Sequence, residues 1–172
     1  ASKFGYPVFN ADHEVSILYK KDKKIFKKLK KKLPKYITSF PINKNEITKA
    51  ILSNKVNLKK IITVVHLEIK KSLKLFLKKN KNKKIVILDI PLLLENKINN
   101  KNDILIFIDS NRLEIEKRLK KRQNFNHKLI KKFKMIQFSS LYKRRKSNFI
   151  IKNNFKKKSL KKSIKKILNE IL

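Results

Sequence analysis

The sequence predicts an α/β fold in three layers, with a parallel β-sheet between helices. Two short apolar runs, residues 85–88 and 104–108, are rich in β-branched side chains and bounded by polar residues. Such runs are typical of strands that are buried on both faces of a parallel sheet. Segments with helical spacing of apolar residues lie before and after them. Strands that alternate with helices indicate βαβ units, whose strands run parallel.

Several elements are predicted before the first of these runs. They are a short strand over residues 6–10 and helices over about 12–20, 23–33, 44–52 and 56–79. A loop that contains Pro41 separates the second and third helices. The longest helix is indicated by apolar residues that repeat at helical spacing. These are Leu58, Ile61, Ile62, Val65, Ile69, Leu73 and Phe76.

The remaining elements follow the strand at residues 104–108. Ser110 or Asn111 caps a helix that runs to about Lys121, and Glu114 stands where a capping box places its acidic residue. The spacing then predicts one helix over residues 126–146, a strand over 149–151 and a final helix. The apolar face of that final helix consists of Leu160, Ile164, Ile167, Leu168 and Ile171.

The length and composition indicate one globular domain. A chain of 172 residues is long enough to bury a real core. It has no cysteine, which excludes a disulfide framework and a thiolate metal site and fits a cytoplasmic protein. No apolar run approaches the roughly 18 residues that span a bilayer, so no membrane partner is expected.

The net charge of +36 has two interpretations. A polyanion surface is one of them. However, only five of the 48 basic residues are Arg, whose planar fork suits base and phosphate recognition, and Lys is spread along every segment. Drift toward AT-rich codons, which encode Lys, Asn and Ile, is the other interpretation. In either case the field attracts phosphorylated small molecules.

An acidic residue closes the apolar run at 85–88. Asp89 follows the run directly, and residues 90–95 form an apolar segment that ends in Glu95. Open α/β sheets bind their ligands at the carboxyl ends of the strands. The segment therefore suits the wall of a substrate pocket, although a core strand with a polar edge would look the same.

Six segments, taken in order, match one pattern of motifs. They are residues 5–12, 42–44, 65–66, 89–95, 118–122 and the stretch from Gln137 to Asn153. They resemble, respectively, a strand that ends in Asp-Ala-Asp, an Ile-Asp-Arg turn, a His-Pro step, a Pro-Leu-Leu-Phe-Glu signature, a paired-Arg lid and a closing Gln…Lys…Asn stretch. In this order they resemble the dephospho-coenzyme A kinase family, which is similar to nucleoside monophosphate kinases.

The resemblance implies a P-loop kinase core in a single domain, residues 1–172. A helical substrate-binding insertion would cover about 20–80 and a helical lid about 111–146. The implied reaction transfers the γ-phosphate of ATP, with Mg²⁺, to the ribose 3′-hydroxyl of dephospho-coenzyme A, the last step of coenzyme A biosynthesis. The partners would be these small molecules, with no specific nucleic acid. A basic RNA- or polyanion-binding protein and another P-loop nucleotide kinase remain the alternatives.

The resemblance also implies roles on the acceptor side of the site. Asp12 matches the general base, although an Asp at a helix start is also a common N-cap. Asp89 ends its strand as a Walker-B Asp does and would hold Mg²⁺ through water, or simply cap the strand end. The residues that match substrate contacts are Lys44, His66, Pro91, Leu92 and Glu95. A lone His on a helix is otherwise more often a packing residue.

The lid residues implied by the resemblance are Arg118, Arg122 and Lys143, and Arg122 is also a catalytic candidate. The spacing of the two Arg predicts that they share one helix face, although a solvated charged face would give the same spacing. Asn153 matches a contact to the adenine nucleotide. The sequence departs from the family pattern at Asn10, Leu67, Asn148 and Lys152.

The motif that the sequence lacks is the P-loop, whose backbone binds the phosphates of ATP in such kinases. The motif G-x-x-x-x-G-K-[ST] needs two glycines, and the chain has only Gly5. In the family that loop precedes the segment matching residues 5–12. We therefore expect a truncated kinase, inactive as given, rather than a degenerate protein.

Overall fold

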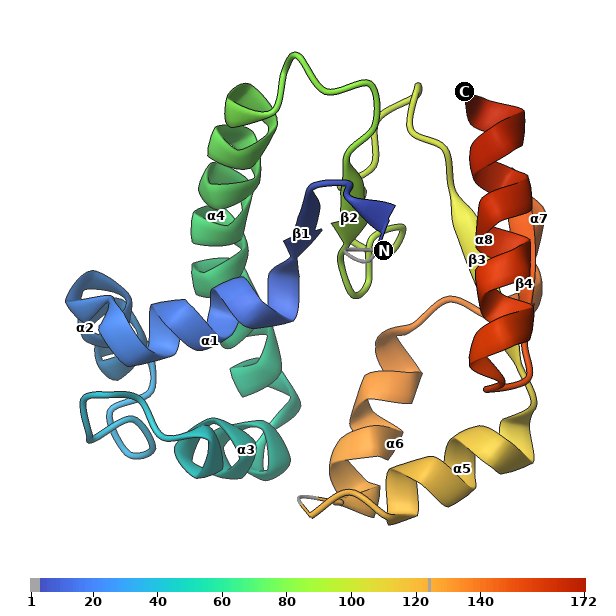
Figure 1. Ribbon diagram of the computed structural model, residues 1–172. Helices are drawn as coiled ribbons and strands as arrows, with labels where there is room; N and C mark the ends of the chain where they lie inside the picture. Colours follow the sequence, from blue (N-terminus) through green and yellow to red (C-terminus); the bar gives the residue numbers. More distant parts are fainter. Residues whose placement is uncertain (1–3, 124) are drawn as a thin grey trace. The chain divides into compact units, whose positions relative to one another are not determined.

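The computed structural model describes residues 4–123 and 125–172 (Figure 1). The chain divides into two compact units, Ala1–Pro91 and Leu92–Leu172. Each unit contains one pair of parallel strands, so the α/β class with parallel pairing is confirmed. In the described ranges no helix is both long and apolar enough to cross a bilayer.

The first unit contains the predicted elements in the predicted order. They are β1 (Val8–Asn10), α1 (Ala11–Lys21), α2 (Lys23–Lys32), α3 (Lys44–Ser53), α4 (Lys55–Lys79) and β2 (Ile87–Asp89). The helices begin where short polar side chains occupy the N-cap positions, and each accepts a hydrogen bond from a backbone N–H of the first turn. These caps are Asn10, Asp22, Asn43 and Asn54. Such a cap stabilises a helix by about 1 kcal/mol.

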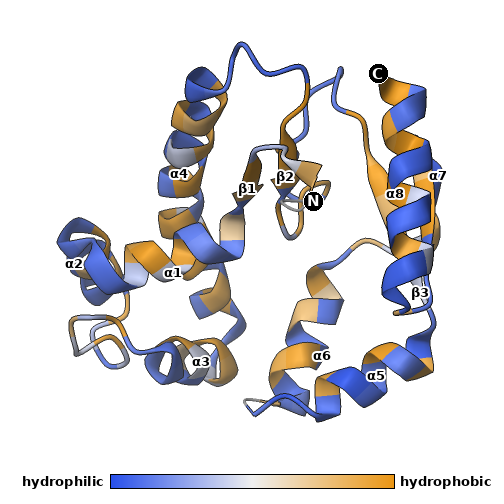
Figure 2. Ribbon diagram, in the orientation of Figure 1, coloured by the Kyte–Doolittle hydropathy of each residue, from blue (hydrophilic) through white to orange (hydrophobic). Residues whose placement is uncertain are grey.

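The core of the first unit is built on α4. Helices α1, α2 and α3 all pack against it, and α4 carries a stripe of apolar residues among polar ones (Figure 2). Ile25, Leu29 and Ile37 are completely enclosed. The predicted positions of α4 that are buried are Leu58, Ile61, Val65, Ile69 and Leu73. The helical spacing therefore identified the inward face correctly.

The second unit contains one strand pair and four helices among its described residues. They are β3 (Ile106–Ser110), α5 (Arg112–Lys120), α6 (His127–Ile136), α7 (Ser140–Lys146), β4 (Phe149–Asn153) and α8 (Lys157–Ile171). Asn111, not Ser110, caps α5, because its side-chain oxygen accepts from Leu113 N and Glu114 N. Helix α8 packs against β4, where Ile151 and Ile167 are buried.

The prediction of one helix over residues 126–146 is wrong. The chain forms α6 and α7, and Gln137 between them is extended. Ser139 caps α7 by accepting from Tyr142 N, and the carboxylate of Glu95 accepts from Phe138 N. Polar side chains thus take the backbone donors that a continuous helix would have bonded internally.

The prediction that the runs at 85–88 and 104–108 are fully buried strands is also wrong. No residue of β2 or β3 is buried, and Ile106 and Ile108 are 43% and 49% exposed. Each strand has a single hydrogen-bonded neighbour among the described residues, β1 for β2 and β4 for β3. A strand in such a pair keeps one edge and much of one face uncovered.

Candidate active site

Two acidic residues lie at or just after the carboxyl ends of the β1–β2 pair. The strands are parallel, and Asn10 pairs with Asp89 in the register. Asp89 is the last residue of β2, and Asp12 lies in the first turn of α1, directly after β1. Because the carboxyl ends of parallel strands lie at the same edge, Asp89 lies at, and Asp12 closely follows, the edge at which α/β sheets commonly bind ligands.

Asn10 organises this edge through both ends of its amide. Its Oδ1 accepts from His13 N at 2.8 Å and so caps α1, while its Nδ2 donates to Asp89 Oδ2 at 2.9 Å. The alternative in which Asp12 is the N-cap is therefore wrong. The carboxylate of Asp12 is exposed and has no hydrogen bond or ion pair within residues 4–123 and 125–172.

Lys44 and His66 occupy different helices of the same unit. Lys44 is the exposed first residue of α3, and His66 is half-buried in the middle of α4. Burial lowers the pKa of His66, and the charge of Lys70 lowers that pKa further. Both effects favour the neutral form of the His66 imidazole. Helix α4 continues through Leu67, which replaces the family's proline.

The segment after β2 is a turn that spans the boundary of the two units. Pro91 is exposed at the end of the first unit, and Leu92 begins the second with a φ of 56°. The carbonyl of Leu92 accepts from both the backbone N–H and the side-chain amide of Asn96, each at 3.0 Å. These bonds hold the turn that carries Glu95.

Glu95 and Lys143 bind each other in the second unit. The Nζ of Lys143 lies 2.8 Å from Glu95 Oε1, and Phe138 N donates to the same oxygen at 2.8 Å. The two side chains are only 8% and 24% exposed. Burial raises the pKa of Glu95, but the hydrogen bonds from Lys143 and Phe138 outweigh it, so the pKa lies below its ordinary value. Glu95 is thus a charged anchor for the start of α7.

The two arginines that the resemblance assigns to a lid have different surroundings. Arg118 lies on α5, with its guanidinium carbon 4.0 Å from the centre of the Phe155 ring. Helix α5 ends at Lys120, and Arg122 follows in a turn in which its N–H bonds to Leu119 O. The prediction that both share one helix face is therefore wrong. Arg122 is exposed beyond the helix end.

Two asparagines at the ends of β4 are engaged with the backbone. Asn153 ends the strand, and its Oδ1 accepts from Phe155 N at 2.9 Å. Asn148, which replaces the family's Asp, accepts from Leu105 N at 2.8 Å and aligns β3 with β4. The side-chain oxygen of Asn153 is therefore hydrogen-bonded within the chain, whereas its amide nitrogen has no partner among the residues that the structure describes.

The sequence reasoning missed the contacts of Asn10 and Phe155 with the candidate residues Asp89 and Arg118. Asn10 had a signal, because an Asn directly before a helix is a preferred N-cap. Phe155 had none, since its contact with Arg118 joins residues far apart in the chain.

Comparison with known proteins decides the family. A family model described as dephospho-CoA kinase matches residues 1–159. The chain belongs to the dephospho-CoA kinase family. It is 30% identical over 171 residues to the dephospho-CoA kinase of Wolbachia pipientis wMel, covering 98% of this chain and 87% of that protein.

Solved structures support the same fold. The Thermus thermophilus protein TT1252 has a TM-score of 0.76 at 20% identity, covering 99% of this chain and 87% of its own. A dephospho-CoA kinase from Campylobacter jejuni has a TM-score of 0.62 at 21% identity, with the same coverage. The chain therefore has the fold of P-loop kinases, as the sequence predicts.

In this member of the dephospho-CoA kinase family, we expect Glu95→Ala to lower the free energy of unfolding by about 2–3 kcal/mol. The change strands the Lys143 ammonium and the Phe138 N–H; the partial exposure of Lys143 keeps the loss below that of a fully buried pair. Urea unfolding measures it. The control is Glu170→Ala, which breaks the exposed pair with Lys166 and should cost under about 0.5 kcal/mol. Equal losses of stability in the two variants would show that the Glu95–Lys143 pair stabilises the fold no more than an exposed ion pair does.

Glu95→Gln should also change the acid response. A carboxyl whose pKa is lowered on folding stabilises the protein above its unfolded pKa, and this stabilisation is lost as the pH falls through the folded pKa. The gap in stability between the parent and Glu95→Gln should therefore be constant near neutrality and close in acid. Urea midpoints from about pH 7 to about pH 3 would show this; a gap that does not depend on pH would contradict it.

Proposed function

We propose that this chain forms the acceptor side and the lid of an enzyme that transfers the γ-phosphate of ATP to the ribose 3′-hydroxyl of dephospho-coenzyme A. One observation carries the proposal: the dephospho-CoA kinase family model matches residues 1–159, across both units. The edge at which Asp12 and Asp89 lie is the ligand-binding edge of such a fold.

Asp12 is the group that receives the proton of the acceptor hydroxyl. Its carboxylate is exposed and makes no hydrogen bond or ion pair in the described part of the chain. Asn10 performs the capping of α1, so Asp12 can accept the proton without disturbing the helix start. Phosphoryl transfer depends mainly on positioning and charge neutralisation, and a base at this place orients the nucleophile.

Asp89 is the residue that would hold Mg²⁺ through water. Mg²⁺ takes one or two carboxylates together with waters and substrate phosphates, and the described residues contain no cluster of three ligating side chains. One exposed carboxylate with a single oxygen bonded to Asn10 fits that donor set. When bound, Mg²⁺ supplies charge neutralisation at the phosphates. Asn10 keeps Asp89 oriented for this role.

The remaining contacts fall on both units. Lys44, His66 and Pro91 would serve the acceptor from the first unit, and Leu92 would do so from the second. Arg118 and Arg122 would neutralise the phosphates, with Asn153 offering its amide nitrogen to the nucleotide. Lys143 would act there only after release from Glu95, because the two form an ion pair.

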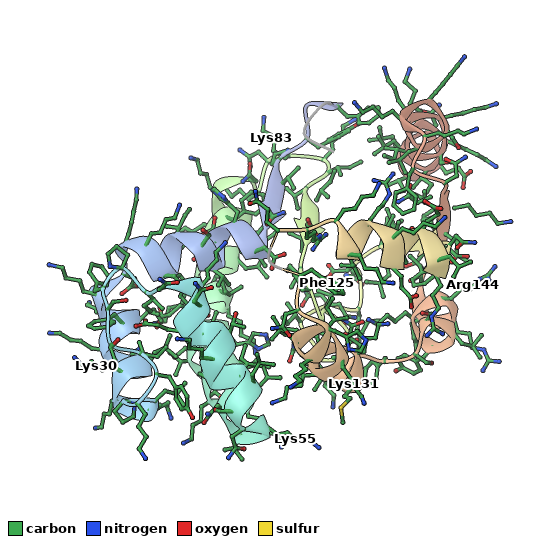
Figure 3. The ribbon with its side chains drawn as sticks, turned by 90° about the horizontal axis from the view of Figure 1, so that it is seen from below. Lys30, Lys55, Lys83, Phe125, Lys131 and Arg144 are labelled. Carbon is green, nitrogen blue, oxygen red and sulfur yellow. The ribbon has the colours of Figure 1, made fainter. Side chains whose placement is uncertain are left out.

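The charge of the chain suits small phosphorylated substrates. Lys30, Lys55 and Lys83 belong to different parts of the first unit, and their side chains extend outward rather than toward one point (Figure 3). A dispersed field of this kind attracts anions without reading a base sequence. It supports the small-molecule partners over a specific nucleic-acid partner.

The test is ADP release with dephospho-coenzyme A as the acceptor. The chain has one glycine and hence no P-loop motif, so we expect little turnover from it alone. A P-loop chimera, in which a strand–loop–helix segment carrying G-x-x-x-x-G-K-[ST] precedes Ala1, should release ADP only when dephospho-coenzyme A is present. Equal turnover by the chain and by the chimera would contradict the expectation that activity needs the P-loop. A chimera that prefers another nucleotide as acceptor would overturn the assigned substrate.

A further inference from the structure

The turn after β4 has an unusual backbone. Phe155 has a φ of 62°, in the left-handed region that aromatic residues rarely adopt. Two successive asparagines hold the turn, since Asn153 Oδ1 accepts from Phe155 N at 2.9 Å and Asn154 Oδ1 accepts from Lys156 N at 3.1 Å. A strained residue that the surroundings hold in place is a reason to look for a function.

The ring of Phe155 lies against the guanidinium of Arg118. The guanidinium carbon is 4.0 Å from the ring centre, within the range of a cation–π contact. The stack joins α5 to the β4–α8 turn inside the second unit. The ring is itself half-buried rather than part of the enclosed core.

The donors of Arg118 remain unused. Within residues 4–123 and 125–172 its guanidinium makes no hydrogen bond or ion pair. By contrast, Arg112 pairs with Glu116 at 3.2 Å and Arg144 lies 4.0 Å from Asp109. A planar guanidinium can stack by its face while its edge binds phosphate in bidentate fashion. The ring of Phe155 therefore contacts the face of the Arg118 guanidinium, and no acidic side chain of the described residues pairs with its charge.

We propose that Phe155 is a positioning residue that fixes the plane of Arg118 and so presents the guanidinium edge to a phosphate group. The inference deepens the proposed function and rests on it, because the phosphates of the nucleotide are the anions that the lid meets. Holding the side chain before binding reduces the rotamer entropy lost on binding. The same turn engages Asn153, the predicted nucleotide contact, so one short segment sets both residues.

The test uses the chain as it is and needs no turnover. The Nε–Hε signals of the five arginines are followed by NMR, with Arg118→Lys to assign the signal of Arg118. In the parent and in Phe155→Tyr, the ring should shift the Arg118 signal upfield. In Phe155→Leu that shift should vanish. Inorganic tripolyphosphate, titrated while the Arg118 signal is followed, should bind about two- to fivefold more weakly in Phe155→Leu and regain its affinity in Phe155→Tyr.

One further variant and one internal control keep the test decisive. Phe155→Gly removes the ring but suits a positive φ, so it should fold and also lose the shift and the affinity. The Arg112 signal is the internal control and should respond equally in every variant. Unchanged Arg118 shift and affinity in both Phe155→Leu and Phe155→Gly would overturn the proposal. Failure of the ADP-release assay would instead reject the proposed function, since the NMR readouts report the stack and anion binding without catalysis.

Discussion

Arg122→Ala in the P-loop chimera is expected to lower kcat by a factor of about 10³. A lid cation acts on the charge that develops on the transferring phosphoryl group, so its loss raises the barrier more than it weakens acceptor binding. Arg122 lies exposed just beyond the end of α5, where a guanidinium can reach a ligand. The KM for dephospho-coenzyme A should therefore change little. Steady-state kinetics with both substrates varied would measure the two effects separately.

Lys120→Ala is the matched control for Arg122. Lys120 is the exposed last residue of α5 and two positions from Arg122, so it tests whether any nearby cation has the same effect. An exposed Lys that contacts no substrate should leave kcat unchanged. If both variants stay within about twofold of the parent, which corresponds to roughly 0.4 kcal/mol in the barrier, Arg122 has no lid function.

The helices of the first unit could be predicted because their signals are local. An apolar repeat fixes the inward face of α4, and the caps Asn43 and Asn54 stand directly before the helices that they begin. Neither signal depends on a distant part of the chain. Ile25 and Leu29 lie four positions apart in the helix predicted over residues 23–33, a spacing typical of one helix face, and both are enclosed in the core.

The errors lie where distant residues decide the structure. The break between α6 and α7 depends on Glu95, whose carboxylate takes the Phe138 N–H from 43 positions away. Helical spacing carries no information about such a contact. The exposure of Ile106 and Ile108 depends on how many strands pair beside β3, which the composition of the run does not report.

The candidate site also has a part that could be predicted from the sequence and a part that could not. That Asp12 and Asp89 bind one ligand stays a prediction, but their place at or just after the carboxyl ends of parallel strands, which share one edge, could be predicted from the sequence. The pairing of Glu95 with Lys143 could not, since each residue matches a different ligand contact in the family pattern. The structure adds that the two charges pair with each other, so the phosphate binding that we propose for Lys143 would have to compete with Glu95.

Asp12→Asn in the P-loop chimera is expected to lower kcat by about 10²-fold or more, the usual contribution of a positioned general base. The amide is nearly isosteric but cannot accept the hydroxyl proton, so the KM for dephospho-coenzyme A should stay near that of the parent. Because Asn10 caps α1, the substitution should lower the melting temperature only slightly, by the loss of one negative charge in the first turn of the helix. Rapid-quench measurement of the phosphoryl-transfer step would separate loss of chemistry from slow product release.

Glu14→Gln is the control for Asp12, because both acidic residues lie in the first turn of α1 and both substitutions remove one negative charge. A general effect of charge at the helix start would lower kcat equally in the two variants. A base at residue 12 predicts a loss in Asp12→Asn alone. If Asp12→Asn keeps kcat within about twofold of the parent, the acceptor hydroxyl does not transfer its proton to Asp12, and the strand edge only binds the substrate.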